Sequence, residues 1–279
     1  MRAIGKEMSR NRLSVMIVAA GLSLAASVSA ADFSYSGDDG PGFWSELDPA
    51  WSACAGTAPD ARQSPVNIGH ARFDRNLRPL ALQSYPTTID MFNNGHTIEQ
   101  RYEGTGSFIH FEGRDYELQQ FHFHTLSEHT INSERGAMEF HAVFQDRSST
   151  DKLVVGEIFE VAGKNNRFLQ VLIDAGLPRK NGATTVTSTP INLADVLVST
   201  SSYFTYPGSL TTPPCSENVT WIVLAKTAKL SQSQFLAFRR ILGNDFRPRQ
   251  ALNGRVVRFT SAQHGEDRDT DWSGENIAE

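Results

Sequence analysis

One short segment places the strongest limit on the fold. In Gln120–His124 the side chains alternate between aromatic rings and histidines. Side chains two apart on a β-strand point to the same face, so His122 and His124 would lie side by side. Phe121 and Phe123 would then point the other way. We therefore expect this segment to be a strand near the centre of a sheet, with two imidazoles on one face.

The same period-two alternation recurs along the chain and predicts a mainly β fold with a single domain. Helical periodicity is limited to 165–175, 231–242 (with Ser231 as N-cap) and 191–197, which predicts short peripheral helices. Residues 31–70 are rich in Gly, Pro, Asp and Ser and contain four aromatic anchors, so we expect an irregular segment held over the core. The expected strands are 96–102, 107–111, 116–124, 137–144 and 153–161.

The first thirty residues have the features of a signal peptide. Basic residues precede the apolar run Leu13–Ala26, and a small-x-small triplet ends at Ala30. Because the run is short for a bilayer span, we expect cleavage after Ala30 and export to the periplasm, an uncleaved membrane anchor being the alternative. The domain would then occupy 31–279, without membrane insertion after cleavage. Residues 264–279 are acidic and are expected to be a frayed tail.

Charge and cysteine content narrow the function further. The chain carries 26 basic and 31 acidic residues, and loss of the basic leader would make it more acidic. Such a protein is a poor candidate for binding nucleic acid or anionic lipid. The two cysteines, Cys54 and Cys215, are expected to form a disulfide in an oxidising compartment. Two separate free thiols are the alternative.

A third histidine, His141, lies on another alternating segment. Three neutral imidazoles with one open position suit a catalytic zinc ion, whose bound water the metal acidifies. Glu139 and Gln120 stand two residues before His141 and His122, so each can accept the N–H of the neighbouring imidazole and fix its tautomer. Histidines that are only hydrogen-bonded, without a metal, are the alternative interpretation.

Several ordered motifs span nearly the whole predicted mature chain. They are Tyr35 with Gly40-Pro41-x-x-Trp44, Arg62–Ile68, Asn93–His96, Gln120–His124, Ser127–Thr130, Glu139–His141, Tyr206–Cys215 and Arg247-Pro248-x-Gln250. By these motifs the chain resembles the α-class carbonic anhydrases of the exported bacterial kind. The resemblance implies a large, mostly antiparallel, twisted central sheet. It also implies zinc-dependent, reversible hydration of CO2 to bicarbonate and a proton through a zinc-bound hydroxide.

The resemblance also implies a role for individual residues. His122, His124 and His141 would hold Zn2+, and Thr211 would orient the hydroxide while donating a hydrogen bond to Glu128. An apolar wall beside the metal would receive the uncharged substrate. The residues implied for this pocket are Val143, Val154, Leu210, Thr212, Val219 and Trp221.

Proton removal is assigned to His96 by the same resemblance. A side chain that titrates near pH 6.5 can pass the proton to buffer, and Tyr35 and Asn94 would order the intervening waters. Two positions depart from the family pattern. Glu99 stands where a neutral amide is usual and could raise the pKa of His96 or disturb the waters. Phe33 replaces a tryptophan, which we expect to affect packing only.

Other expectations concern ligands and alternatives. CO2 and bicarbonate are the implied substrates, sulfonamides and anions the implied inhibitors, and a homodimer is a candidate assembly. Ser64–Pro65 and Pro213–Pro214 are candidates for cis peptide bonds. A catalytically inactive carbonic anhydrase-like binding protein is the alternative function. A zinc peptidase is disfavoured because His124–His129 matches neither H-E-x-x-H nor H-x-x-E-H.

Overall fold

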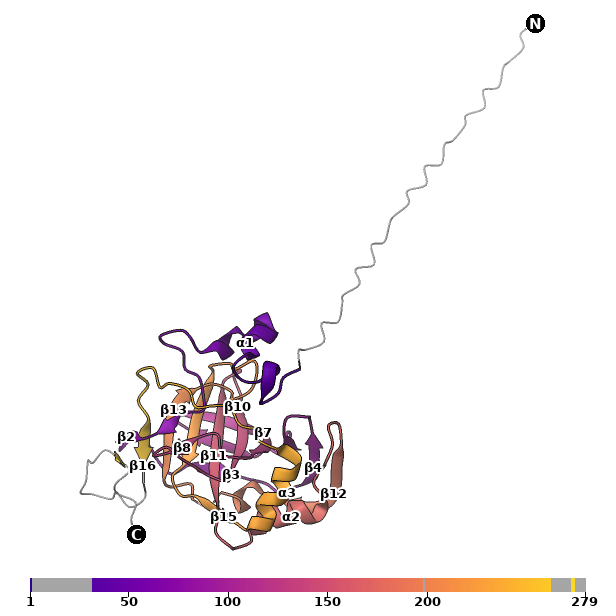
Figure 1. Ribbon diagram of the computed structural model, residues 1–279, viewed down its shortest axis with the longest axis vertical. Helices are drawn as coiled ribbons and strands as arrows, with labels where there is room; N and C mark the ends of the chain where they lie inside the picture. The colour runs from indigo at the N-terminus through magenta and orange to yellow at the C-terminus, as the bar shows by residue number, and fades with distance from the viewer. Residues whose placement is uncertain (2–31, 198, 262–271, 274–279) are drawn as a thin grey trace. The chain divides into compact units, whose positions relative to one another are not determined.

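The computed structural model of the protein describes Met1 and residues 32–197, 199–261 and 272–273 (Figure 1). Apart from Met1, the expected signal peptide and its cleavage site lie outside the described residues. Among the residues described, no helix is long and apolar enough to cross a membrane.

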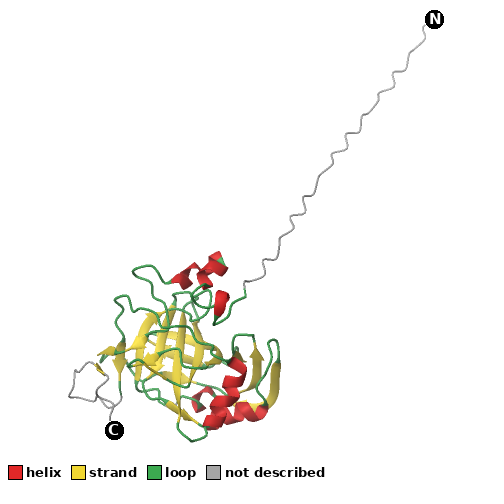
Figure 2. Cartoon of the chain, viewed as in Figure 1, coloured by secondary structure: helices red, strands yellow, loops and turns green. Residues whose placement is uncertain are grey.

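A large sheet forms the centre of the molecule (Figure 2). Its main path runs β12-β4-β5-β7-β10-β11-β14-β13-β16-β2-β17, with β3, β6 and β15 paired beside it. Most pairs are antiparallel, whereas β11 is parallel to β14 and β15, and β16 is parallel to β2. A mainly β fold on a mostly antiparallel sheet is therefore confirmed.

The first half of the chain supplies the strands β1 Asn67–Ile68, β2 His70–Phe73, β3 Ala81–Gln83, β4 Thr87–Asn93, β5 Ile98–Arg101, β6 Phe108–Phe111, β7 Arg114–His124, β8 Thr130–Ile131, β9 Glu134–Arg135 and β10 Met138–Asp146. The second half supplies β11 Lys152–Val161, β12 Thr184–Ile191, β13 Tyr203–Gly208, β14 Val219–Leu224, β15 Ala228–Leu230, β16 Arg258–Thr260 and β17 Trp272–Ser273. The α-helices are α1 Trp44–Leu47, α2 Arg167–Ala175 and α3 Gln232–Leu242, and the 3-10 helices are η1 Gly37–Asp39, η2 Pro49–Ala55 and η3 Leu193–Asp195.

The phenylalanine face of the central strands forms the larger core. Phe121 and Phe123 on β7 are fully buried and pack against rings from α2 and α3. The centroid of Phe121 lies 5.6 Å from that of Phe168 on α2, and the centroid of Phe123 lies 4.7 Å from that of Phe238 on α3. This burial explains why the amphipathic pair of helices covers this face.

Both longer helices are present: α2 begins two residues later than expected, and α3 begins directly after the expected N-cap. The Asn166 side chain accepts a hydrogen bond from Leu169 N at the start of α2. Ser231 forms a capping box with Gln234 at the start of α3, which confirms it as the N-cap. Of the third expected helix, 191–197, only η3 is helical.

The N-terminal segment is held by rings, as expected, but it is not wholly irregular, because it contains η1, α1 and η2. Its aromatic side chains cluster with the disulfide between Cys54 and Cys215, whose Cα atoms are 5.1 Å apart. The buried guanidinium of Arg247 adds a second link, because it donates to Cys54 O (2.8 Å) and to Ser64 O (2.9 Å). The segment is thus fastened to loops near the end of the domain. Ser64–Pro65 and Pro213–Pro214 are cis, which confirms that prediction.

One expectation about the C-terminus is wrong. Trp272–Ser273, within the supposed frayed tail, forms β17 and pairs antiparallel with β2. Trp272 is buried because its ring packs 4.8 Å from that of Phe204. The prediction failed because the acidic composition of this stretch suggested disorder, whereas the one large aromatic side chain in it is enough to dock the segment on the sheet. The rest of 264–279 lies outside the described residues.

Candidate metal centre and its cavity

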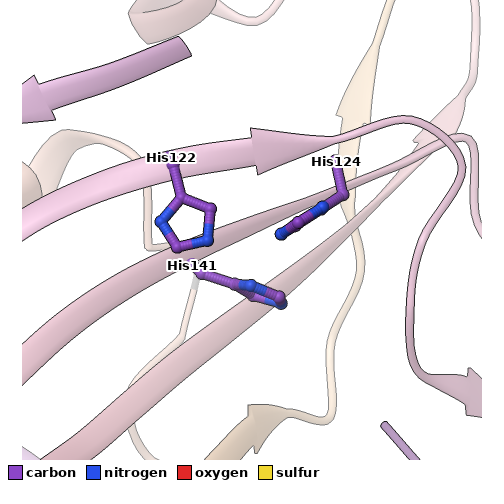
Figure 3. Close-up of side chains that lie close together, drawn as sticks. All are labelled: His122, His124 and His141. Carbon is purple, nitrogen blue, oxygen red and sulfur yellow. The ribbon is translucent and has the colours of Figure 1, made fainter. Parts of the chain in front are cut away.

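Two neighbouring strands bring the three histidines together. His122 and His124 lie on β7, and His141 on β10 is the direct register partner of His122. The ring centroids of the three pairs are 4.7 to 5.2 Å apart, and the rings converge on one point (Figure 3). One nitrogen of each ring lies within 4.8 Å of the other two.

The second nitrogen of each ring is already engaged. His122 Nδ1 lies 2.8 Å from Gln120 Oε1, and His141 Nε2 lies 2.9 Å from Glu139 Oε1, as the sequence predicts. His124 Nδ1 lies 2.6 Å from the backbone oxygen of Asp245. Each of these oxygens can accept a hydrogen bond from the ring N–H. The lone pairs that remain are therefore on Nε2 of His122, Nε2 of His124 and Nδ1 of His141.

The three free nitrogens fit a metal ion. Nε2 of His124 is buried and has no hydrogen-bond partner among the described residues. Burial lowers the pKa of His122 well below its usual value, and the neighbouring His124 and His141 lower it further. Three neutral imidazoles with inward lone pairs are the donor set that zinc prefers.

A buried network supports His141 from behind. Glu139 Oε1 also lies 2.7 Å from Nδ1 of His129, whose Nε2 lies 2.6 Å from the Tyr206 hydroxyl. The Tyr206 hydroxyl in turn donates to Ser64 Oγ at 3.0 Å. Burial alone would raise the pKa of Glu139, but His129 and His141 hold it well below its usual value. His129 thus fixes the carboxylate that orients a metal-site histidine.

Glu128 is held at one oxygen only. Its Oε1 accepts from the backbone N–H of Arg247 at 2.8 Å. Its buried Oε2 has no hydrogen-bond partner within the described chain and lies 3.6 Å from Nε2 of His124. The hydrogen bond expected from the Thr211 hydroxyl is therefore not formed, although the Thr211 side chain is also nearly buried, at 5% exposure.

His122 and His141 line a cavity of about 320 Å3, whereas the buried His124 is not among its lining residues. Most of the expected pocket residues line it, whereas Val219 does not and is buried in the same apolar cluster as Val143, Val154 and Trp221. Sequence reasoning missed the polar residues of the outer part, although the period-two pattern His141, Val143, Gln145 pointed to one of them. The lining is Glu103, Gln119, Gln120, His122, His141, Val143, Gln145, Lys152, Val154, Leu210, Thr211, Thr212 and Trp221.

His96 lies outside this lining set. Its ring stacks on that of Phe33, with centroids 3.8 Å apart and planes at 8°. Phe33 therefore contacts the expected proton-transfer residue and does not serve only to pack the N-terminal segment. Burial lowers the pKa of His96, and Asp32, whose Oδ1 is 3.6 Å from His96 Nε2, opposes this shift. The carboxylate that acts on His96 is therefore that of Asp32 and not that of Glu99. Burial raises the pKa of Glu99 itself.

The two residues expected to assist His96 have different environments. Asn94 Oδ1 accepts from the backbone N–H groups of His96 (2.9 Å) and Thr97 (2.8 Å), so this side chain shapes the turn. The hydroxyl of Tyr35 is buried without a hydrogen-bond partner in the described structure. Burial raises its pKa well above the usual value, and Glu128 and Asp245 add to the rise.

Comparison with known proteins gives consistent matches along the domain. The model of a family described as eukaryotic-type carbonic anhydrase matches residues 39–261. A carbonic anhydrase of Klebsiella pneumoniae is 37% identical over 232 residues, which cover 82% of this chain and 92% of the relative. A hyperthermostable carbonic anhydrase from a hydrothermal vent chimney superposes with a TM-score of 0.76 at 37% identity, covering 82% of this chain and 100% of the other. The α-carbonic anhydrase of Thermovibrio ammonificans, in complex with the inhibitor sulfanilamide, gives a TM-score of 0.75 at 34% identity, with coverage of 82% and 100%.

Proposed function

The chain belongs to the eukaryotic-type, or α, carbonic anhydrase family, and we propose how its own residues carry out the reaction of that family. It is a zinc-dependent carbonic anhydrase, which hydrates CO2 reversibly to bicarbonate and a proton. The observation that carries this conclusion is the convergence of three imidazole nitrogens whose partner nitrogens are all engaged. The alternative of an inactive binding protein has no support in this site, because no ligand histidine is missing.

Nε2 of His122, Nε2 of His124 and Nδ1 of His141 would hold the zinc ion. When bound, zinc supplies the nucleophile by lowering the pKa of a water molecule, an effect for which carbonic anhydrase is itself the standard example. The chain contributes the geometry, because Gln120, Glu139 and the backbone oxygen of Asp245 prevent each ring from turning its lone pair away.

Glu128 and Thr211 orient the nucleophile in this proposal. Glu128 is fixed through Oε1 by the backbone of Arg247, which leaves Oε2 as an acceptor aimed at the site. When the Thr211 hydroxyl donates its hydrogen to Oε2 of Glu128, the Thr211 oxygen can act only as an acceptor. It then accepts a hydrogen bond from the O–H of the nucleophile. That chain directs the lone pair of the nucleophile at the substrate.

CO2 would lie against the inner, apolar part of the cavity. Val143, Val154, Leu210 and Trp221 line it, and all except the partly buried Leu210 are nearly inaccessible to water. Because CO2 has no net charge or dipole, an apolar surface beside the nucleophile holds it without competing hydrogen bonds. Thr212 would lie at the edge of this pocket, and Val219 would support it from behind.

His96 would carry the product proton to buffer. Its stacking on Phe33 places it at the N-terminal segment, where Asp32 stabilises its charged form. Asn94 would fix the turn that carries His96, and Tyr35 would offer a hydroxyl to the waters between His96 and the metal centre. Burial lowers the pKa of His96, and a lowered pKa favours release of the proton to a buffer near neutral pH.

Stopped-flow CO2 hydration by the zinc-loaded protein from pH 6 to pH 9 tests the proposed function. We expect fast hydration that rises with pH, and its near-complete loss in His124→Ala although that variant keeps the wild-type circular dichroism spectrum. A zinc-loaded wild-type protein that hydrates CO2 no faster than the buffer blank would contradict the proposal. The inactive binding protein would then be the better interpretation.

We further propose export to the periplasm after cleavage behind Ala30, as the apolar leader and the Cys54–Cys215 disulfide suggest. N-terminal sequencing of the protein from a periplasmic extract tests the cleavage site.

Sulfonamides and small anions are the proposed inhibitors, in line with the sulfanilamide complex of the Thermovibrio relative. A homodimer is a further proposal, which light scattering tests directly.

A further inference from the structure

The cavity wall is built in rows across the sheet, and each row has its own chemistry. The register pairs His141 with His122 and with Gly156, which defines the inner row. One step outward, Val143 pairs with Val154, which pairs with Trp221, and these three residues of the middle row are apolar, whereas Gln120, the partner of Val143 on β7, is polar. A further step outward, Gln145 on β10 pairs with Lys152 on β11 and, on its other side, with Glu117 on β7, whose carboxylate lies 3.5 Å from Arg147; these residues form the outer row.

Strand geometry fixes how far these rows lie from one another. Each row is two residues from the next, so Lys152 lies about 13 Å along β11 from Gly156, the residue beside His141. All side chains at this spacing point to the same face. Lys152 therefore faces the cavity at the level of its mouth, beyond the apolar row. This agrees with its presence in the cavity lining.

The ammonium of Lys152 is positioned but not neutralised. Within the described part of the chain it donates to Gln145 Oε1 at 3.1 Å and forms no ion pair. The amide of Gln145 carries no charge, so it orients the ammonium without cancelling its field. The lining also contains one carboxylate, that of Glu103. A partly buried lysine beside apolar side chains is a stronger attractor for an anion than one surrounded by water.

We propose that Lys152 forms an anion subsite at the mouth of the cavity. It takes a carboxylate group, either that of bicarbonate on its way out of or into the cavity, or that of a ligand anchored at the metal centre. Gln145 is the positioning residue that directs the ammonium inward. This inference rests on the proposed function, because it concerns ligands that enter the same cavity.

Two benzenesulfonamides that differ in one group test the subsite. The first carries a carboxylate opposite the sulfonamide and the second an uncharged carboxamide of nearly the same shape. Dissociation constants of both are measured by calorimetry with the zinc-loaded protein. In Lys152→Gln we expect the preference for the carboxylate, relative to the carboxamide, to fall about two- to five-fold. The loss should shrink in 1 M salt, where charges are screened beyond about 3 Å.

Three matched variants show whether the effect belongs to this position. Lys152→Arg should keep most of the preference, because the charge remains. Lys226→Gln removes the same charge from an exposed lysine outside the cavity lining and should leave the preference unchanged. Glu103→Gln should increase the preference, because it removes the competing carboxylate. At constant ionic strength, bicarbonate should displace the carboxamide less effectively from Lys152→Gln than from the wild type. The three matched variants should not show this loss.

The outcomes separate the inference from the proposed function. If the carboxamide binds and the preference is the same in Lys152→Gln as in the wild type, the anion subsite is wrong and the proposed function stands. If neither compound binds the zinc-loaded wild type, both fail. A fall of similar size in Lys226→Gln would also overturn the subsite, since it would reflect net charge alone.

Discussion

The two faces of β7 and β10 place opposite demands on the side chains they carry. On one face Phe121, Phe123 and Phe140 pack among other rings, where shape and volume decide the stability. On the other face His124, His141 and Glu139 are also buried and His122 is partly buried, yet each is held by particular hydrogen bonds. The comparison teaches that the same burial tolerates a change of side chain on the first face and not on the second.

Glu139→Leu should produce the largest effect. Its removal leaves His129, His141 and the backbone N–H groups of residues 128 and 129 without their acceptor. We expect a loss of about 3–5 kcal/mol in the free energy of unfolding. Urea unfolding of the chelator-treated protein measures it. A loss below about 1 kcal/mol would show that the network contributes little, and the comparison would no longer hold.

Gln120→Ala should act on the metal and not on the fold. Without its oxygen the ring of His122 is free to turn, so we expect zinc affinity to fall about 10- to 100-fold. Competition with a chromogenic chelator measures this. Gln119→Ala is the matched control, because Gln119 also lines the cavity but bonds to Glu117 O. Equal losses in the two variants would contradict the role assigned to Gln120.

The stability of the metal-free protein should depend on pH in part through His122. Because the pKa of His122 in the fold is well below 6.5, the unfolded chain binds more protons between the two values. The contribution of His122 to the free energy of unfolding is then fully present above pH 6.5. It is lost as the pH falls below 6.5, by up to about 1.4 kcal/mol per pH unit. Urea unfolding at pH 7.5, 6.5 and 5.5 measures the slope. His122→Gln should have a smaller slope, and an unchanged one would refute this assignment.

Phe140→Leu should produce the smallest effect. Phe140 is the neighbour of Glu139 on the same strand but faces the other way. An apolar replacement that roughly keeps the volume should cost about 1 kcal/mol, with no change in zinc affinity or in the pH slope. Differential scanning calorimetry and the chelator assay measure both. A loss as large as that of Glu139→Leu would mean that the two faces do not differ in tolerance.

Periodicity and local chemistry made much of this site predictable. The alternation along 116–124 and 137–144 placed the histidines on one face and showed which of them share a strand. The positions of Gln120 and Glu139 followed from the same two-residue step. Short strands such as β3, β8 and β15 were not predicted, because a few residues give no measurable period, and the longer strands β4, β12, β13 and β14 were missed as well.

Other parts of the site left no local signal. The acceptor for His124 is the backbone oxygen of Asp245, and every residue type has such an oxygen. The link of His129 to Tyr206 joins residues far apart in the chain. The cavity position of Lys152 depended on the register between β10 and β11, which the sequence alone does not fix. Long-range pairing, not composition, therefore limits what can be predicted here.

The bond between His124 and the backbone of Asp245 also has a consequence for the order of synthesis. All three ligand histidines have been made when translation reaches residue 141, but the oxygen that fixes the ring of His124 belongs to residue 245. Arg247, which holds Glu128 and fastens the N-terminal segment, comes later still. A chain that ended before residue 245 would carry every zinc ligand and still lack a finished site. The enzyme therefore becomes competent late, after residues 245–247 have joined the rest of the domain.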